Sequence, residues 1–249
     1  MHSRRYTIEQ STGIIYCDDE NIIEEAIKYI GETRLQVEKF ISEFQEFKHM
    51  LEPWDVDDIA KKHEIPDVIT RMIVAAKTFQ VGPMASVAGA IVDVAHDRLI
   101  ANEHDNFLLE NGGEIRVHGN RIFTIGLYAG KATIGAHLGF RIPPNKLDFS
   151  GIATSSATIG HAMSFGSADL VTVFCKNAAL ADAAATLICN ETNGENAEVS
   201  IKNALKVAEK NKEITGAFIA MKEKVGVVGK IPELVRLNGD EMDLLQFIP

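Results

Sequence analysis

The strongest constraint on the fold is the low charge and high glycine content of residues 83–190. This stretch has 16 charged side chains in 108 positions, whereas residues 1–82 have 26, and it holds 11 of the 19 glycines. Glycine is used where the backbone turns sharply or passes close to another backbone or to a ligand. Residues 83–190 are therefore predicted to form the buried, turn-rich centre of the protein.

Helical periodicity dominates the chain before this segment. Apolar residues recur mostly at spacings of three and four over residues 20–51, with charged residues between them, which predicts one or two amphipathic helices interrupted near Gly31. Further helices are expected from Asp67, a candidate cap, and over residues 87–99. Residues 1–66 are thus interpreted as a helical N-terminal extension.

The spacing of the apolar residues changes after residue 100. Short β-branched or aromatic runs separated by Gly and Asn are typical of antiparallel strands joined by tight turns. An alanine-rich helix with Asn177 as its cap follows the last run of the central segment. The expected strands are 107–109, 114–118, 121–128, 137–142, 169–175, 217–221 and 226–229, and the expected helices of this part are 177–189 and 197–211.

Composition excludes several classes of partner and site. The formal net charge is −10, and no basic tract is present, so neither nucleic acid nor an anionic membrane is an expected partner. The three cysteines have no metal-binding or redox spacing, and the first 16 residues lack the apolar core of a signal peptide. No run approaches the length of a membrane span. A cytoplasmic location is therefore expected.

Asn111-Gly112-Gly113 lies between two strand-like runs. Glycine pairs allow positive φ angles and let a backbone amide approach a ligand. A hairpin turn is the simpler interpretation of these three residues, and a binding loop is the alternative.

Residues 151–166 contain an unusual concentration of hydroxyl groups around one histidine, His161. Such a segment could bind phosphate or ribose oxygens, or it could be a polar loop whose hydroxyls cap its own backbone. A serine nucleophile with His161 as its base is a weaker hypothesis, because no GxSxG elbow is present. The hydroxyl residues are Thr154, Ser155, Ser156, Thr158 and Ser164.

Asp182 and Thr186 are four residues apart in the alanine-rich helix, so their side chains share one face. Both are hard oxygen ligands suited to Mg²⁺, but a complete coordination shell needs about six oxygens. By spacing alone, a solvent-facing aspartate and a threonine bonded back to the carbonyl of residue 182 are the simpler interpretation.

A set of motifs, taken in order over roughly residues 67–235, resembles a compact prokaryotic branch of the ApbE superfamily. The motifs are residues 81–91 (VGPMASVAGAI), 110–115 (ENGGEI), 151–156 (GIATSS), 160–161 (GH), 164–166 (SFG), 168–169 (AD) and 180–186 (LADAAAT). The best-known members are flavin transferases, which use Mg²⁺ to move FMN from FAD onto a Thr or Ser of a partner protein, and some members hydrolyse FAD to FMN and AMP. The resemblance implies an α+β, T-fold-like architecture of antiparallel sheets backed by helices, with residues 1–249 as one domain.

The resemblance also implies a site. It places the metal ligands at Asp182 and Thr186, the Gly-Gly strand end near the flavin at Asn111, Gly112 and Gly113, and the family histidine at His161. Asp182 and His161 are the candidate catalytic residues that follow. Thr154, Ser155 and Ser156 join Asn111, Gly112, Gly113 and His161 as candidate cofactor-binding residues, with Mg²⁺ and FAD or FMN as the implied cofactors.

Two departures from the family pattern affect the expected activity. Transferases of the family usually carry a Lys-Gly pair where this chain has Ala88-Gly89, and the loop around His161 is shortened. The first hypothesis is therefore a protein that binds a flavin or another nucleotide diphosphate with Mg²⁺ at Asp182 and Thr186, with FMN transfer or FAD hydrolysis as the reaction.

Two alternatives belong to other functional classes. One is a non-catalytic accessory or ligand-sensing protein in the sulfur or cofactor metabolism of anaerobes, with a protein partner. The other is a hydrolase or acyl-transfer enzyme that uses Ser155 or Ser156 with His161. The identity of any protein partner and self-association into a homo-oligomer are left open.

Overall fold

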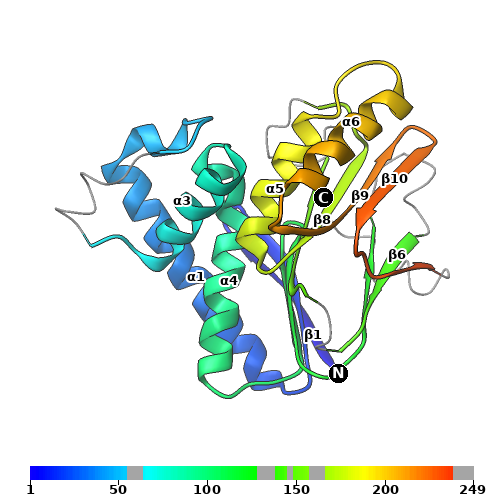
Figure 1. The fold of residues 1–249 in the computed structure, drawn as a ribbon. Helices are drawn as coiled ribbons and strands as arrows, with labels where there is room; N and C mark the ends of the chain where they lie inside the picture. The colour runs from blue at the N-terminus through cyan, green and yellow to red at the C-terminus, as the bar shows by residue number, and fades with distance from the viewer. Residues whose placement is uncertain (55–63, 128–137, 145–147, 157–165, 238–249) are drawn as a thin grey trace.

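A long antiparallel sheet forms the framework of the protein (Figure 1). The computed structural model describes residues 1–54, 64–127, 138–144, 148–156 and 166–237. Every neighbouring pair of strands in this eight-stranded sheet is antiparallel. In spatial order the strands are β1 (His2–Ile8), β2 (Ser11–Cys17), β3 (Phe107–Asn111), β4 (Glu114–His118), β7 (Gly151–Ser155), β8 (Leu170–Cys175), β9 (Ile214–Met221) and β10 (Lys224–Gly229).

The helices cover one face of this sheet (Figure 1). α4 packs on β3 and β4, α5 on β7 and β8, and α6 on β9 and β10, while α1 lies against β1 and β2. The helical elements are α1 (Glu20–Glu43), α3 (Asp67–Phe79), α4 (Val87–Ala101), α5 (Ala178–Asn190) and α6 (Ala197–Lys210), with two 3₁₀ turns, η1 (Gln45–Lys48) and η2 (Pro83–Ser86).

A smaller sheet packs against the other face. Its strands are ordered β11 (Glu233–Arg236), β6 (Leu138–Ile142) and β5 (Phe123–Gly126). Phe140 of β6 meets Phe174 and Phe218 of the large sheet edge to face, with ring centroids 5.0 and 5.7 Å apart. Aromatic side chains bury large apolar areas in such contacts, so they join the two sheets.

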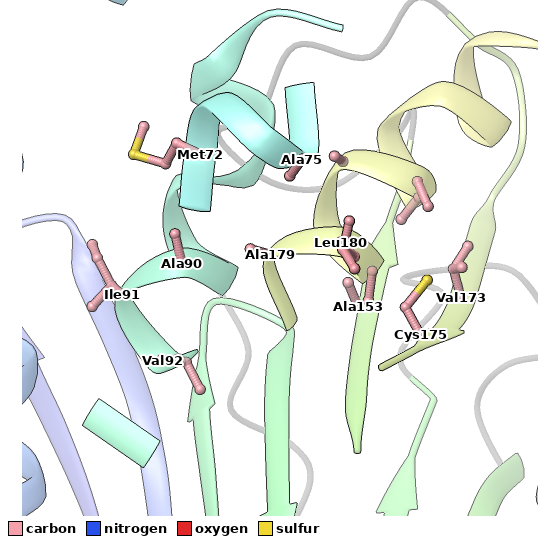
Figure 2. Close-up of a cluster of buried hydrophobic side chains, with 14 of the residues drawn as sticks. Met72, Ala75, Ala90, Ile91, Val92, Ala153, Val173, Cys175, Ala179 and Leu180 are labelled. Atoms are coloured by element: carbon pink, nitrogen blue, oxygen red, sulfur yellow. The ribbon is translucent and has the colours of Figure 1, made fainter. Parts of the chain in front are cut away.

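The larger core lies between the eight-stranded sheet and the helices. Ala90 of α4, Ala179 of α5 and Ala153 of β7 are fully or almost fully buried where these elements meet (Figure 2). Small side chains let the two helices approach each other and the sheet closely. Larger apolar residues such as Met72 and Ile91 fill the surrounding space.

Most of the sequence expectations for this architecture are confirmed. The α+β class with antiparallel sheets backed by helices is observed. Asn177 caps α5, its side chain accepting a hydrogen bond from the backbone amide of Leu180. α1 runs through Gly31 without the expected interruption, and Asp67 is the first residue of α3 rather than its cap.

Two expectations are wrong. Residues His2–Cys17 form the β1–β2 hairpin instead of belonging to a helical extension, because they pair with the edge of the large sheet through β3. The first part of the hydroxyl-rich segment, Gly151–Ser155, is the interior strand β7 rather than a loop. Pairing with neighbours on both sides determines the structure of such a short, small-residue segment.

In the part of the chain that the structure describes, no single helix is long and apolar enough to cross a membrane. Asp67–Phe79 and Pro83–Ala101 would suffice in length and composition only as a pair, and that pair is bent by 107°.

The close approach of α4 to α5 gives a first prediction. A Cβ built on Gly89 would lie 2.3 Å from the carbonyl oxygen of Ala178, so Gly89→Ala forces two helix backbones apart. We expect a loss of about 3 kcal/mol in the free energy of unfolding, measured by urea denaturation.

Gly31→Ala is the matched control. A Cβ at Gly31 would lie 3.5 Å from Cδ1 of Ile8, an ordinary contact, and Gly31 is also inside a helix. This variant should gain about 1 kcal/mol from helix propensity alone. Equal effects of the two substitutions would contradict the importance of the helix crossing.

Candidate functional site

Two aspartates bind the helices α4 and α5 to each other where they cross. Asp182 of α5 accepts a hydrogen bond at Oδ2 from the amide of Gly89 in the first turn of α4, at 3.0 Å. Asp93 of α4 accepts hydrogen bonds from the amides of Ala178 and Ala179 in the first turn of α5, both at 2.9 Å. Each helix therefore supplies the carboxylate that caps the other helix, and each carboxylate interacts favourably with the positive end of the partner's dipole.

Asp93 is fully committed to this structural role. Both of its oxygens bond to α5, and Nε of Arg116 lies 3.3 Å from Oδ1. Burial raises the pKa of Asp93, while the charge of Arg116 and the two amides lower it. Arg116 is itself held by the carbonyl of Lys176 and by Nδ1 of His96, both at 2.9 Å. This network fixes the start of α5.

Asp182 differs from Asp93 because only one of its oxygens has a bond of this kind. No described cationic side chain pairs with it. Burial raises its pKa to about 7; the Gly89 amide opposes this shift, and Asp93 adds to it. Thr186 lies one turn further along α5, as predicted, and is half-buried. Among the described residues Thr186 makes no hydrogen bond back to the carbonyl of residue 182. The spare Asp182 oxygen and the Thr186 hydroxyl are thus both available to a ligand.

A carboxylate on the sheet, that of the buried Glu114, lies near enough to the half-buried Asp182 for the two charges to interact. Glu114, the first residue of β4, is 7 % exposed and has no described cationic partner. Burial raises the pKa of Glu114 well above its ordinary value, and the negative charges of Asp182 and Glu110 raise it further. Its Oε2 would lie 3.4 Å from a Cβ built on Gly112, so the carboxylate lies beside the glycine turn. Glu114 was not among the residues predicted from the sequence, since a carboxylate in a strand that also carries Arg116 and His118 gives no local signal of a site.

The Gly112–Gly113 segment is the two-residue turn of the β3–β4 hairpin, with φ angles of +71° and +111°. The hairpin interpretation of these residues is therefore confirmed. Asn111, which is 2 % exposed, donates from Nδ2 to the carbonyl of Ala88 at 3.3 Å. This bond holds the end of β3 against the first turn of α4, next to Gly89.

The hydroxyl-rich segment is divided between the two faces of the large sheet. Thr154 Oγ1 lies 3.0 Å from Oγ1 of Thr172, on the face opposite the helices. Ser155 shares the helix-facing side with Ala153, because side chains alternate along a strand. Ser156 follows β7 directly and is half-buried. Thr154 is therefore on the face of the sheet away from the α4–α5 crossing, whereas Ser155 is on the face that the helices cover.

His161, Thr158 and Ser164 lie outside the described residues. The segment that follows resumes at Gly166, where a Cβ would lie only 1.7 Å from the carbonyl oxygen of Cys189 near the end of α5. The described contacts connect Asp182 of α5 with Asn111 and Gly112 of the β3–β4 turn, through Ala88, Gly89 and Glu114. Thr186 follows Asp182 one turn along α5, and Ser155 lies on the helix-facing side of β7.

The metal-binding potential of this site rests on few side chains. Within the described part of the chain, no group of three or more His, Cys, Asp or Glu residues has the arrangement of a metal centre. A cation here would therefore need the Thr186 hydroxyl, backbone carbonyls, water or ligand oxygens besides a carboxylate. η2 is the short helical element that packs against α5 on this side.

The two sheets, the helix layer and the glycine turn beside the helix crossing define an ApbE-type fold. The structure is similar to the solved apbe protein of Thermotoga maritima, with a TM-score of 0.54 and 11 % identity over 97 % of this chain and 98 % of that chain. It is also similar to an H257G mutant of the flavin transferase ApbE from Vibrio cholerae, with a TM-score of 0.51 and 13 % identity over 92 % of this chain and 97 % of that chain. At these identities the likeness concerns the fold.

Sequence comparisons then identify the family. The chain is 42 % identical over 236 residues to a UPF0280 protein of Methanocaldococcus jannaschii, covering 94 % of this chain and 93 % of that protein. It is 38 % identical over 209 residues to a UPF0280 protein of Methanobrevibacter smithii, covering 84 % and 86 %. The family model described as AbpE bacteria matches residues 5–222. The chain belongs to this family, which confirms the resemblance inferred from its motifs.

The buried carboxylates give a prediction for pH dependence. Burial raises the pKa of Glu110 to about 7, against the effect of the two backbone amides that it accepts. A raised pKa means that the folded protein holds this proton more tightly than the unfolded chain does. The resulting stabilisation is present below about pH 4.5 and is lost as the pH rises through 7.

Glu110→Gln removes this titration. Between pH 4.5 and pH 8 the free energy of unfolding of the wild type should fall relative to that of Glu110→Gln by about 2 to 3 kcal/mol. Urea denaturation of both proteins across this pH range measures the difference, in which the titration of groups that do not interact with Glu110 cancels. A constant difference would contradict the raised pKa.

Proposed function

We propose that this protein binds a flavin nucleotide, FAD or FMN, together with Mg²⁺ beside the α4–α5 crossing, and that the bound FAD is hydrolysed or its FMN is transferred. The observation that carries the proposal is the pair of ligand oxygens on α5. One oxygen of Asp182 and the hydroxyl of Thr186 lie one turn apart with no described partner, in a protein of the ApbE family.

The charge of the site supports a cation. The half-buried Asp182 and the buried Glu114 place two carboxylates near each other, and no described lysine or arginine pairs with either. Unpaired buried charges are costly, so such groups either hold protons or bind a cation. Carboxylate and hydroxyl oxygens are the ligands that Mg²⁺ prefers. Asp182 and Thr186 would hold the ion, and Glu114 would add negative charge close to it.

The ligand class follows from charge balance and from the family. The chain has a net charge of −10, so a diphosphate needs a cation to offset repulsion. Position 88 supplies no positive charge, since it carries Ala where family transferases usually carry Lys. A bound Mg²⁺ would supply this charge and, as a Lewis acid, would stabilise negative charge on a phosphate that leaves. Solved proteins of this fold are named flavin transferases.

One observation favours a second function, ligand sensing by a non-catalytic accessory protein. Ala88 removes the cation that transferases of the family usually place at this position, while the carbonyl of Ala88 and the amide of Gly89 keep their bonds to Asn111 and Asp182. This arrangement preserves the shape of the site but reduces its positive charge. Binding without turnover would support this alternative.

Asp182→Asn provides the direct test. Asparagine keeps an oxygen that accepts from the Gly89 amide, so the helix cap remains, but the negative charge is lost. We expect at least a 100-fold loss of Mg²⁺-dependent FAD binding, measured by flavin fluorescence, and the same loss of any FMN release or transfer. The free energy of unfolding should change by no more than about 1 kcal/mol.

Two further variants complete this experiment. Thr186→Val keeps the shape of the side chain without its hydroxyl and should weaken Mg²⁺-dependent binding about tenfold. Glu191→Gln removes an exposed carboxylate at the end of the same helix and should leave binding unchanged. The proposal fails if the wild type binds no FAD in the presence of Mg²⁺, or if Asp182→Asn binds it as the wild type does.

A further inference from the structure

The backbone amides of the glycine turn are both occupied within the protein. Gly112 donates from its amide to the carbonyl of Thr12 in the β1–β2 hairpin at 2.9 Å. Gly113 donates to Oε1 of Glu110 at 2.7 Å. Neither amide is directed outward to receive a phosphate oxygen, although amides in glycine-rich loops often take that role.

Glu110 connects this turn to the N-terminal hairpin. Its second oxygen, Oε2, accepts a hydrogen bond from the amide of Ile14 in β2 at 2.9 Å. Its own carbonyl accepts from the Tyr6 hydroxyl of β1, also at 2.9 Å. The side chain is 7 % exposed, so these bonds are shielded from water. Glu110 thus links β2 and the β3–β4 turn through its carboxylate, and β1 through its backbone carbonyl.

The carboxylate in this position has a specific role, because an apolar residue would leave the amides of Ile14 and Gly113 without their acceptor. Burying a charge is unfavourable unless it is compensated, and here two amides provide most of the compensation. The bonds fix the orientation of a turn that glycine would otherwise leave adaptable, since both glycines have positive φ and no side chain. Polar groups of this kind determine geometry more than they add stability.

We propose that Glu110 is a positioning residue for ligand binding: its carboxylate holds the Gly112–Gly113 turn against the β1–β2 hairpin with the turn amides directed inward. The turn then presents a surface without Cβ atoms to a flat ring of the ligand. The phosphates of the ligand would lie near α5, beside Asp182 and Thr186. Gly112 is exposed and Gly113 is half-buried, so a ligand can reach this turn from outside. This inference rests on the proposed function.

The test compares Glu110→Gln with Tyr6→Phe. A glutamine amide can accept from only one of the two backbone amides and directs its NH₂ group at the other. Tyr6→Phe removes the neighbouring bond to the Glu110 carbonyl and leaves the carboxylate intact. FAD affinity is measured with saturating Mg²⁺, Mg²⁺ affinity is measured without FAD, and hydrogen exchange is followed at the amides of Ile14 and Gly113.

We expect Glu110→Gln to weaken FAD binding about tenfold, to leave Mg²⁺ binding unchanged and to speed exchange at Ile14 or Gly113 at least tenfold. Tyr6→Phe should bind FAD within twofold of the wild type. FMN and ADP as separate probes show whether the affected ring is the flavin or the adenine.

Two results would overturn the inference, and they are distinguishable from each other. Wild-type FAD affinity in Glu110→Gln would overturn the positioning role alone, because the proposed function would still stand. Absence of FAD binding in the wild type itself would overturn the proposed function and the positioning role with it. Equal losses of FAD binding in Glu110→Gln and Tyr6→Phe would show a general effect on the hairpin, which also contradicts a role for the carboxylate.

Discussion

The structure depends on the reciprocal capping of α4 and α5. Asp93 caps α5 and Asp182 caps α4, and each lies four residues after the point where its own helix meets the other, at Gly89 and Ala178. The arrangement requires a backbone contact that only glycine permits at position 89. Because α4 packs on β3 and β4 and α5 packs on β7 and β8, this crossing also sets the position of both helices over the sheet.

The two capping aspartates differ in how their charge is compensated. This difference distinguishes Asp93, which has a structural role, from Asp182, which belongs to the candidate site. Asp93 has Arg116 beside it and uses both oxygens, so its charge is compensated within the protein. Asp182 uses one oxygen and faces Glu114 with no described cation. A protein that needed only stability would gain by replacing such a pair with neutral residues. This unpaired charge is the physical basis of the cation that we propose for the site.

The sequence revealed the parts of this arrangement that depend on local pattern. The pattern of apolar residues predicted α4, and the alanine-rich composition with the cap Asn177 predicted α5. The spacing of Asp182 and Thr186 predicted that both lie on one face of α5. Glu114, Asp93 and Glu110 could not be found in this way, since their importance comes from burial and from partners distant in the chain. β7 and the β1–β2 hairpin escaped prediction for the same reason. β7 consists mostly of small residues and the hairpin mixes polar and apolar ones, and both are strands because their neighbours pair with them.

The alanine at position 88 shows how such a site can change its chemistry without changing its shape. The first turn of α4 is held through the backbone, by Asn111 at the carbonyl of Ala88 and by Asp182 at the amide of Gly89. These bonds use backbone atoms, so replacing lysine with alanine at position 88 changes the charge without removing them. If the proposed function holds, the cation would be the main source of positive charge for an anionic ligand. Affinity for the ligand should consequently follow the occupancy of the metal site more steeply than in a transferase that carries the lysine.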